Sequence, residues 1–409
     1  MSDGSWLTDQ RTRAVAVICG ALSLLMLGVL FVTAKGTLDI FGRPLGTDFS
    51  DVWTAGHMAL HGGAPDVWDW GKHYAAQQAT HHSRSVPFYG WHYPPPFLLV
   101  AAALALLPYI QALLVWQIAT LAAAARQLHR ILPYRRTLLF GLTAPVVFVC
   151  LGHGQNGFLT GTLLAGGLFL LDRRPLAAGL LLGCLVYKPQ FAVIVGPLLL
   201  VTGNWRALIG AVVSAGLLIV ATLLWWGPAV WDAFFHSLPL TRHVIIEKGA
   251  TGWEKIQSPF AMIRMWGGGI DVAYAVQALA TVGAVGIALW LARKASADLR
   301  NAAVMAAAIL STPYVLDYDY VVLDFGMAFL VKDGLQRGFL SFEKSLLALV
   351  WLAPLFARQL AQVSLIPLGQ ATAVIVIWLA LRRAILLDGA LHGEVRPSPS
   401  RHSHGLSGQ

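Results

Sequence analysis

The sequence predicts an all-α polytopic membrane protein with about 12 transmembrane helices and a large first extracytoplasmic loop. Of its 409 residues, 57% are hydrophobic and only 12% are charged, and the mean hydropathy is +0.64. Soluble domains carry about 25% charged residues, so a soluble fold is excluded. The apolar residues recur in runs separated by short basic connections, as expected for membrane spans.

The first apolar run covers residues 14–34 and follows Arg11 and Arg13. A secretory signal is one interpretation, because Val32-Thr33-Ala34 resembles a cleavage site. The run is longer than the core of a usual signal peptide, and the rest of the chain is also apolar. We therefore expect a signal anchor with the N-terminus in the cytoplasm.

Charge placement supports an arrangement of twelve spans with both termini inside. The positive-inside rule places basic residues in cytoplasmic connections. The basic clusters that fall on that side are 126–136, 173–174, 204–206, 293–300, 332–344 and 382–383. The predicted spans are 14–34, 97–126, 137–151, 157–171, 175–187, 190–202, 205–226, 270–291, 301–314, 320–331, 345–358 and 365–383.

Some of these spans are too short to cross a bilayer as full helices. A crossing needs about 20 residues, yet residues 175–205 would have to cross twice. We expect half-length helices that meet near Lys188-Pro189-Gln190, with Lys188 facing a cavity. The long run 97–126 is interpreted as one span kinked at Pro108, with a short hairpin as the alternative.

The chain is predicted to form one transmembrane domain over residues 1–387. Two outer loops are expected, at 35–96 and 227–265, and the first is long enough for short interfacial helices. Residues 388–409 are polar and rich in Ser, Pro and His, so we expect a disordered cytoplasmic tail. The three cysteines lie in apolar runs without metal or redox spacing and are interpreted as core residues.

The segment Gly46-Thr47-Asp48-Phe49-Ser50-Asp51 is the most informative part of the first outer loop. It places two carboxylates just beyond a bilayer exit, where polar groups are costly and tend to be functional. Asp48 and Asp51 therefore suggest acid/base chemistry on a lipid-borne substrate, and we expect the neighbouring carboxylate to raise the pKa of Asp48. An ordinary solvated loop is the alternative. The histidines of this loop are scattered, so no zinc site is predicted.

Two further polar sites interrupt the apolar sequence. Residues 152–157, Gly-His-Gly-Gln-Asn-Gly, offer the amides of Gln155 and Asn156 to sugar hydroxyls; a helix-capping turn is the alternative. Lys188 is a cation inside an apolar region and would suit a phosphate; snorkelling to the surface is the alternative.

Near the second outer loop, Arg242, Gln257-Ser258 and Arg264 are candidate contacts. The later segment from Thr312 to Tyr320 brings Asp317 and Asp319 together with three tyrosines. Those carboxylates could cap a helix, but the five groups together favour a substrate contact.

In order along the chain, these motifs resemble glycosyltransferase family 87. The resemblance rests on Gly-Thr-Asp48-Phe with Ala55-Gly56, Tyr93-Pro94-Pro95, Gly154-Gln155-Asn156-Gly157, Lys188-Pro189 and a Pro-Tyr-x-x-Asp-Tyr-Asp element, and it extends from Ala14 to Arg383. Members are polyprenyl-phosphate-sugar-dependent transferases of the GT-C superfamily, including mycobacterial enzymes that extend phosphatidylinositol mannosides. Those enzymes carry histidines where this chain has Tyr318 and Asp319, which leaves the sugar and the acceptor open.

The resemblance implies a GT-C-like bundle that moves a hexose, mannose first among the candidates, from a polyprenyl-phosphate donor to a lipid-linked or glycan acceptor on the extracytoplasmic face of the plasma membrane. Asp48 would be the general base of an inverting displacement. Lys188, with Arg242 or Arg264, would bind the donor phosphate. No cofactor and no metal are expected. The remaining residues assigned to substrate binding are Asp51, His92, Tyr93, Gln155, Asn156, Gln190, Gln257, Ser258, Tyr314, Asp317, Tyr318 and Asp319.

Other classes of protein fit less well. A secondary transporter or lipid-linked-sugar flippase would explain many spans and broken helices, but the two halves of the chain show no sequence symmetry. A non-catalytic scaffold does not explain why the polar residues collect on one side. Nucleic acid is excluded as a partner, because no basic stripe interleaved with aromatic residues lies outside the apolar runs.

Overall fold

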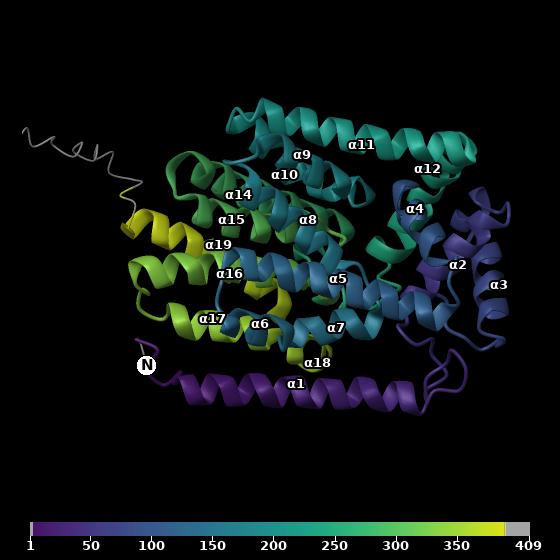
Figure 1. The fold of residues 1–409 in the computed structure, drawn as a ribbon, viewed down its shortest axis with the longest axis horizontal. Helices are drawn as coiled ribbons and strands as arrows, with labels where there is room; N and C mark the ends of the chain where they lie inside the picture. The colour runs from purple at the N-terminus through teal and green to yellow at the C-terminus, as the bar shows by residue number, and fades with distance from the viewer. Residues whose placement is uncertain (1–2, 388, 390–409) are drawn as a thin grey trace, which may run out of the picture.

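The computed structural model describes residues 3–387 and 389, and within them every regular element is helical. The predicted tail from residue 388 onward therefore lies, apart from Gly389, outside the described residues. Most of the longer helices run along one common direction, and α2, α3, α4 and α12 gather at one end of this bundle (Figure 1). The all-α prediction is confirmed.

The helices fall into three groups along the chain. The first group is α1 (Asp9–Val32), α2 (Phe49–Leu60), α3 (Trp70–Thr80), α4 (Pro96–Leu104), α5 (Tyr109–Ile131), α6 (Arg135–Leu142) and α7 (Pro145–His153). The second group is α8 (Gly157–Leu170), α9 (Pro175–Gly183), α10 (Ala192–Val201), α11 (Trp205–Trp226), α12 (Ala229–Thr241) and α13 (Pro259–Met265). The third group is α14 (Ile270–Lys294), α15 (Ala297–Leu310), α16 (Val321–Arg337), α17 (Glu343–Leu352), α18 (Ala357–Ser364) and α19 (Leu368–Leu387).

Four of the described helices are long and apolar enough to cross a membrane, namely α1, α11, α14 and α19. The number rises to six if two bent helix pairs each count as one span: α6 with α7, bent by 54°, and the pair 343–355 with 357–364, bent by 76°. The predicted count of twelve is not confirmed, because several predicted spans form helices of only 10–17 residues.

The region around Lys188 agrees with the prediction of half-length helices. The helical segment from Pro175 ends at Tyr187, and the next one begins at Pro189. Lys188 therefore lies in a break between two short apolar helices, where its side chain is buried.

The prediction of one kinked span over residues 97–126 is wrong. The stretch forms two helices, α4 and α5, separated by Ala105–Pro108. α4 packs mainly against α2 and only lightly against α5. This packing is close because Gly56 of α2 has no side chain: a Cβ there would lie 2.0 Å from the carbonyl oxygen of Ala101. α5 begins directly after Pro108, and α4 is packed against α2.

Both predicted outer loops contain helices. Residues 35–96 include α2, a 3₁₀ turn and α3, and residues 227–265 include α12, a π-helix at Arg242–Glu247 and α13. These helices lie at the end of the bundle where α1 finishes (Figure 1). They supply walls of the site described below.

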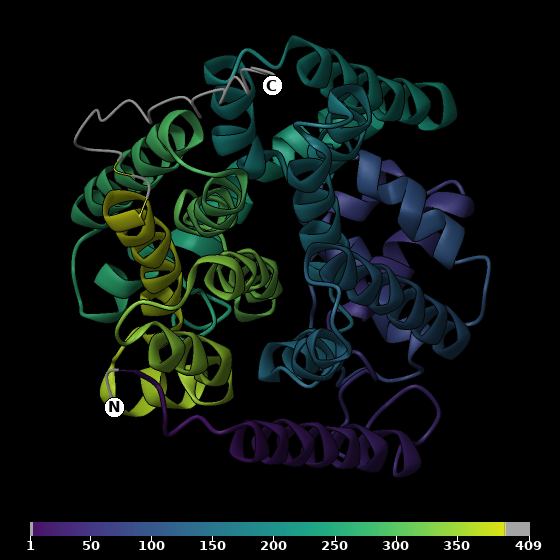
Figure 2. The same cartoon turned by 60° about the vertical axis from the view of Figure 1, so that its left-hand side comes forward.

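The core is built around α15, whose residues from Leu299 to Leu310 are all buried. In contrast, α1 packs mainly against α6 and α7 and lies at the edge of the bundle (Figure 2). Two arginines that the sequence placed in cytoplasmic connections are instead buried partners: Arg383 pairs with Asp333 and Glu343, each at 2.6 Å, and Arg300 binds Asp172 through two nitrogens.

Candidate active site

Asp48 is held where two glycine turns meet. Gly46 (φ +73°) and Gly154 (φ +62°) both adopt the left-handed conformation that side chains disfavour. A Cβ on Gly154 would lie 3.0 Å from the Gly46 carbonyl oxygen and 2.7 Å from Cβ of Phe49. The two turns therefore touch backbone to backbone, which brings the polar residues after Gly152 next to the start of α2.

The Asp48 carboxylate has two partners from the second turn. Gln155 Nε2 donates to Asp48 Oδ2 at 3.0 Å. His153 Nδ1 lies 3.6 Å from Asp48 Oδ1 and 2.8 Å from the hydroxyl of Thr47. The Asp48 side chain remains 22% exposed, so it is oriented by the protein yet accessible to a ligand.

Gln155 links Asp48 to the interior of the site. Its side-chain oxygen accepts a hydrogen bond from the Tyr93 hydroxyl at 2.9 Å and another from the backbone N–H of Asn156 at 3.2 Å. Because the oxygen accepts both bonds, the amide nitrogen is left to donate to Asp48. The result is a chain of hydrogen bonds from Tyr93 through Gln155 to Asp48.

The expectation that the pKa of Asp48 is raised is wrong. Burial pushes its pKa upward, but the charge of His153 and hydrogen bonds from His153 and Gln155 outweigh burial, so the pKa lies below its ordinary value. Asp51 behaves in the opposite way: burial and the nearby Asp48 charge raise its pKa well above the ordinary value. Asp51 Oδ1 also has no hydrogen-bond partner among the described residues. The negative charge of this pair therefore resides on Asp48.

Arg358 is part of the site although sequence reasoning did not select it. Its Nε donates to Asp317 Oδ2 at 2.9 Å, and its Nη2 lies 3.2 Å from Nε2 of His153. Arginine can only donate, so Nε2 of His153 must accept, and the ring proton of a neutral imidazole then resides on Nδ1, toward Thr47 and Asp48. The sequence signal that could have identified Arg358 is the position of an arginine within a predicted apolar span.

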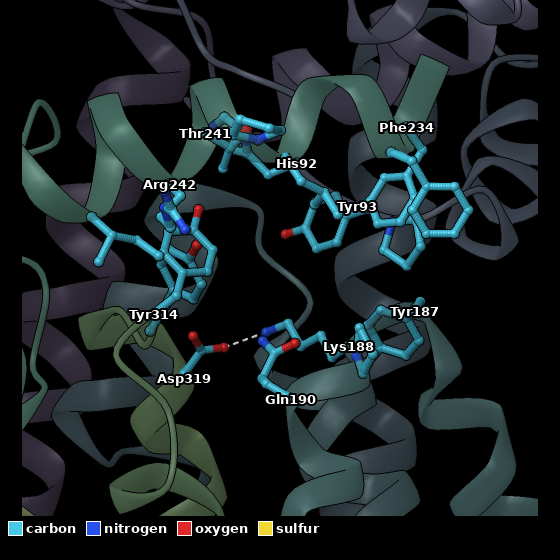
Figure 3. A pocket seen from close by; sticks show the side chains of 17 residues that line it. His92, Tyr93, Tyr187, Lys188, Gln190, Phe234, Thr241, Arg242, Tyr314 and Asp319 are labelled. Atoms are coloured by element: carbon cyan, nitrogen blue, oxygen red, sulfur yellow. Dashed lines mark hydrogen bonds and ion pairs between the residues drawn. The ribbon is translucent and has the colours of Figure 1, made fainter. Parts of the chain in front are cut away.

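A cavity of about 570 Å³ lies beside this cluster (Figure 3). The polar and aromatic residues that line it are His92, Tyr93, Tyr187, Lys188, Gln190, Thr241, Arg242, Tyr314, Tyr318 and Asp319. Its apolar wall comes largely from α12 and the π-helix that follows and consists of Phe234, Phe235, Leu238, Pro239 and Ile246. The predicted cavity at Lys188 is therefore present.

Lys188 and Asp319 form a buried ion pair at this cavity (Figure 3). The other Asp319 oxygen accepts the backbone N–H of Leu316 at 3.1 Å. Both side chains are about 6% exposed. Lys188 is thus not a snorkelling residue, since its ammonium stays inside the protein with a carboxylate.

Two cavity residues extend this environment. Arg242 lies at the cavity and contacts Glu247 at 3.2 Å, but its side chain is 66% exposed, which leaves it free to turn toward a ligand. Burial lowers the pKa of His92 to about 4 although the Asp48 charge opposes the shift. His92 is therefore neutral near pH 7, and its Nδ1 lies 3.1 Å from the Thr241 hydroxyl.

Several predicted site residues lie outside the cavity lining. Ser258 caps α13 by accepting from the N–H of Ala261 at 3.1 Å. The backbone of Gln257 pairs with Val315 and accepts from Tyr320. Arg264 donates to the carbonyls of Gly268 and Glu247. These contacts join loops to one another.

Asn156 has a different environment from these structural residues. It is 1% exposed, and neither its side-chain oxygen nor its nitrogen has a partner among the described residues. Amide groups buried in this way cost free energy. In the described part of the chain, no group of three or more His, Cys, Asp and Glu side chains is placed to hold a metal ion.

A comparison with protein families identifies residues 91–316 as a match to glycosyltransferase family 87. No curated protein and no solved structure matches the chain. The matched segment is more than half of the sequence and contains Tyr93, Gln155, Lys188 and Arg242, and a place in the GT-C superfamily is consistent with it. This chain belongs to glycosyltransferase family 87.

Proposed function

We propose that the protein transfers a hexose, mannose being the first candidate, from a polyprenyl-phosphate donor to a lipid-linked or glycan acceptor. The reaction takes place on the extracytoplasmic face of the plasma membrane, with Asp48 as the general base. One observation carries the proposal: Asp48 is connected through Gln155 to Tyr93, and Tyr93 lines the same cavity as Lys188 and Arg242. The link between this carboxylate and a cavity lined by two cations supports the assignment of a base, a sugar space and a phosphate site.

The chemistry is a single displacement at the anomeric carbon of the sugar. The acceptor oxygen forms a bond to that carbon while the bond to the donor phosphate oxygen breaks, and the electron pair leaves with the phosphate. Asp48 takes the proton of the acceptor hydroxyl. Attack from the face opposite the phosphate inverts the configuration.

The departing phosphate acquires charge that the cavity must stabilise. Lys188 has three N–H donors, so it can keep its bond to Asp319 and still donate to a phosphate oxygen. Its buried position strengthens this interaction relative to water. Arg242, exposed at the mouth of the cavity, is the second cation. Arg264 is left out of this assignment because its guanidinium is engaged with two loop carbonyls.

The rest of the cavity fits the two parts of such a donor. The apolar wall made by Phe234, Leu238 and Ile246 suits the first isoprene units of the lipid. The polar side, with His92, Gln190 and Tyr314, offers donors and acceptors to sugar hydroxyls. Asp51, Asn156, Asp317 and Tyr318 lie around this space and are assigned to acceptor binding or support of the site.

The test is a donor panel. Purified protein is incubated with polyprenyl phosphates that carry different hexoses, and released polyprenyl phosphate and the glycosylated acceptor are measured together. We expect release with one hexose above the others and inverted linkage in the product. Movement of intact donor across vesicle membranes without release of polyprenyl phosphate would instead favour a flippase. Release from nucleotide sugars alone would overturn the choice of donor.

The matched control for the base is Asp66→Asn in the same loop. Asp66 forms an exposed ion pair with Lys72 at 2.6 Å and has no contact with the Asp48 cluster. Its loss should leave transfer unchanged, because exposed ion pairs contribute little to stability.

A further inference from the structure

A second, larger cavity lies at the opposite end of the bundle from Asp48, where α1 begins. Its volume is about 890 Å³. It is enclosed by the start of α1, the end of α5 with α6, and one face each of α16 and α17. In Figure 1, α6 and α17 lie next to each other, with the beginning of α1 alongside them. The transferase proposal makes no use of this space.

One wall of this cavity has the dimensions of an acyl chain. Asp324, Met327, Ala328, Val331 and Leu335 recur at helical spacing along one face of α16. From Asp324 to Leu335 this face extends about 16 Å at about 1.5 Å per residue. That length is close to half of the roughly 30 Å hydrocarbon core of a bilayer. The opposing face of α17 is also apolar, with Leu347, Ala348, Trp351 and Leu352.

The end of the cavity near the start of α1 is positively charged. Arg11, Arg135, Arg136 and Lys344 are all among its lining residues. Arg136 is paired with Asp9 at 2.6 Å. Within the described residues, no carboxylate forms an ion pair with Arg11, Arg135 or Lys344. The single acidic residue of the lining, Asp324, lies at the far end of the α16 face and cannot neutralise them.

The position of α1 gives this cavity a structural consequence. Only 11% of the apolar window of α1 is buried, and α1 packs mainly against α6 and α7. Val15 of α1, together with Trp6 and Leu7 just before the helix, lines the cavity. The indole of Trp6 already donates to Ser345 of α17 at 3.0 Å, and an occupant of the cavity would add further contacts between α1, α16 and α17.

We propose that this cavity binds one anionic phospholipid from the leaflet opposite the candidate active site. Its phosphate lies among Arg11, Arg135 and Lys344, and one acyl chain lies along the apolar face of α16. Cations at a membrane surface attract anionic lipid headgroups, and the chain removes the lining side chains from water or bulk lipid. The proposal is independent of the transferase reaction, since it uses none of the residues around Asp48.

Native mass spectrometry of the purified full-length protein in detergent tests this assignment. Phosphatidylglycerol and phosphatidylcholine with the same acyl chains are titrated separately, and lipid bound per protein is measured. Ala348→Phe fills the cavity from α17. Leu349→Phe is the matched control, because Leu349 is the next residue of the same helix and is exposed on its outer side.

We expect one phosphatidylglycerol to bind in preference to phosphatidylcholine, and Ala348→Phe to abolish this binding while Leu349→Phe retains it. The double variant Arg135→Gln/Lys344→Gln keeps the apolar walls and tests the charge separately. It should weaken phosphatidylglycerol binding on the order of 30-fold, from about 5-fold for each cation removed near a membrane surface.

Three results would overturn the proposal. Equal binding by the Ala348→Phe and Leu349→Phe variants would show that the lipid lies elsewhere. Equal affinity for the two lipids would remove the role of the cations. Displacement of phosphatidylglycerol by a lower concentration of polyprenyl phosphate would identify a different lipid as the occupant. The Arg135→Gln/Lys344→Gln variant keeps the proposal testable if Ala348→Phe fails to fold, because the two side chains that it changes are exposed.

Discussion

The Asp48 cluster (Asp48, His153 and Gln155) and the Lys188–Asp319 pair place a carboxylate in opposite environments. Asp48 is partly exposed and is held by the amide of Gln155 and the imidazole of His153. Asp319 is buried against a lysine that neutralises it. The first arrangement leaves a free negative charge at the surface of the site. In the second arrangement the Lys188 ammonium is already paired with Asp319, so an anionic ligand has to compete with that carboxylate for it.

This difference supports the separate roles that we propose for the two regions. A base must be ionised and accessible to the proton that it removes, which describes Asp48. A phosphate site must hold cationic donors in a region of low dielectric before the ligand arrives, which describes Lys188. The predictions below test whether the two roles can be separated.

The largest effect is expected for Asp48→Asn. The amide retains the shape of the side chain but cannot accept a proton, so transfer should fall about 10²–10⁴-fold while donor binding persists. Turnover and donor affinity are measured on the same preparation. Asp51→Asn should have a smaller effect, because burial and the Asp48 charge raise the pKa of Asp51 and make it the weaker candidate for an ionised base. Full activity of Asp48→Asn with loss of activity in Asp51→Asn would exchange the two roles.

The second prediction concerns Lys188 and corrects a simpler expectation from the sequence, that Lys188→Met would weaken donor binding and leave the fold intact. The ion pair means that Lys188→Met also leaves Asp319 buried without its cation. Such a change destabilises proteins by about 3–5 kcal/mol. The double variant Lys188→Met/Asp319→Asn should recover most of that stability but not donor binding. Thermal unfolding and donor affinity are measured for both variants.

Recovery of donor affinity by the double variant would contradict the phosphate role of Lys188. In that case the single variant would have lost binding only through misfolding. Arg242→Gln then becomes the next variant to measure, since Arg242 is the other cation that lines the cavity.

Local sequence features predicted the parts of the fold that depend on local physics. Hydropathy alone located α1, α11, α14 and α19, because each is a continuous apolar helix of at least 20 residues. The helix break at Lys188-Pro189 could also be predicted, because proline cannot continue a helix and the flanking segments are too short to cross a bilayer. The family resemblance selected Tyr93, Gln155 and Lys188 as site residues, and in the structure Tyr93 bonds Gln155 and lines one cavity with Lys188.

Contacts between distant residues were beyond local reasoning. Lys188 and Asp319 are 131 positions apart, and Arg358 reaches His153 across 205 positions. The direction of the Asp48 pKa shift was mispredicted for the same reason. Asp51 is close to Asp48 in the sequence, but the contacts of Asp48 with Gln155 and His153 are formed only by the fold. The division of 97–126 falls at Pro108, which was visible in the sequence, but the packing of α4 against α2 at Gly56 was not.

The third prediction tests Arg358 as a positioning residue. Arg358→Gln removes the donor that keeps Nε2 of His153 an acceptor, so the ring can present the wrong nitrogen to Asp48. Loss of a hydrogen bond from a charged group amounts to about 1.5–3 kcal/mol, so kcat should fall roughly 10- to 100-fold while KM for the donor is unchanged. Arg358→Lys should restore part of kcat, because lysine donates but cannot bridge both partners.

The control for Arg358 is Gln362→Ala, one turn further along α18, where the side chain makes an exposed contact of 3.4 Å with Glu254. Its kcat should match that of the parent. A rise in KM equal to the fall in kcat for Arg358→Gln, without rescue by lysine, would indicate a structural role only.

The smallest effect is a shift in the pH dependence of kcat/KM. Asp48 acts as the ionised form, so activity is lost as pH falls through its pKa. Because that pKa lies below its ordinary value, the acid limb of the parent should lie at lower pH than for an unperturbed aspartate. Gln155→Leu removes one of the hydrogen bonds that lower this pKa, so the limb should move to higher pH. Gln190→Leu is the comparison, since it alters an amide of the cavity that has no bond to Asp48: its rate should change without a shift of the limb. An unmoved limb in Gln155→Leu would mean that another group sets it, and that Asp48 is not the base whose ionisation limits transfer.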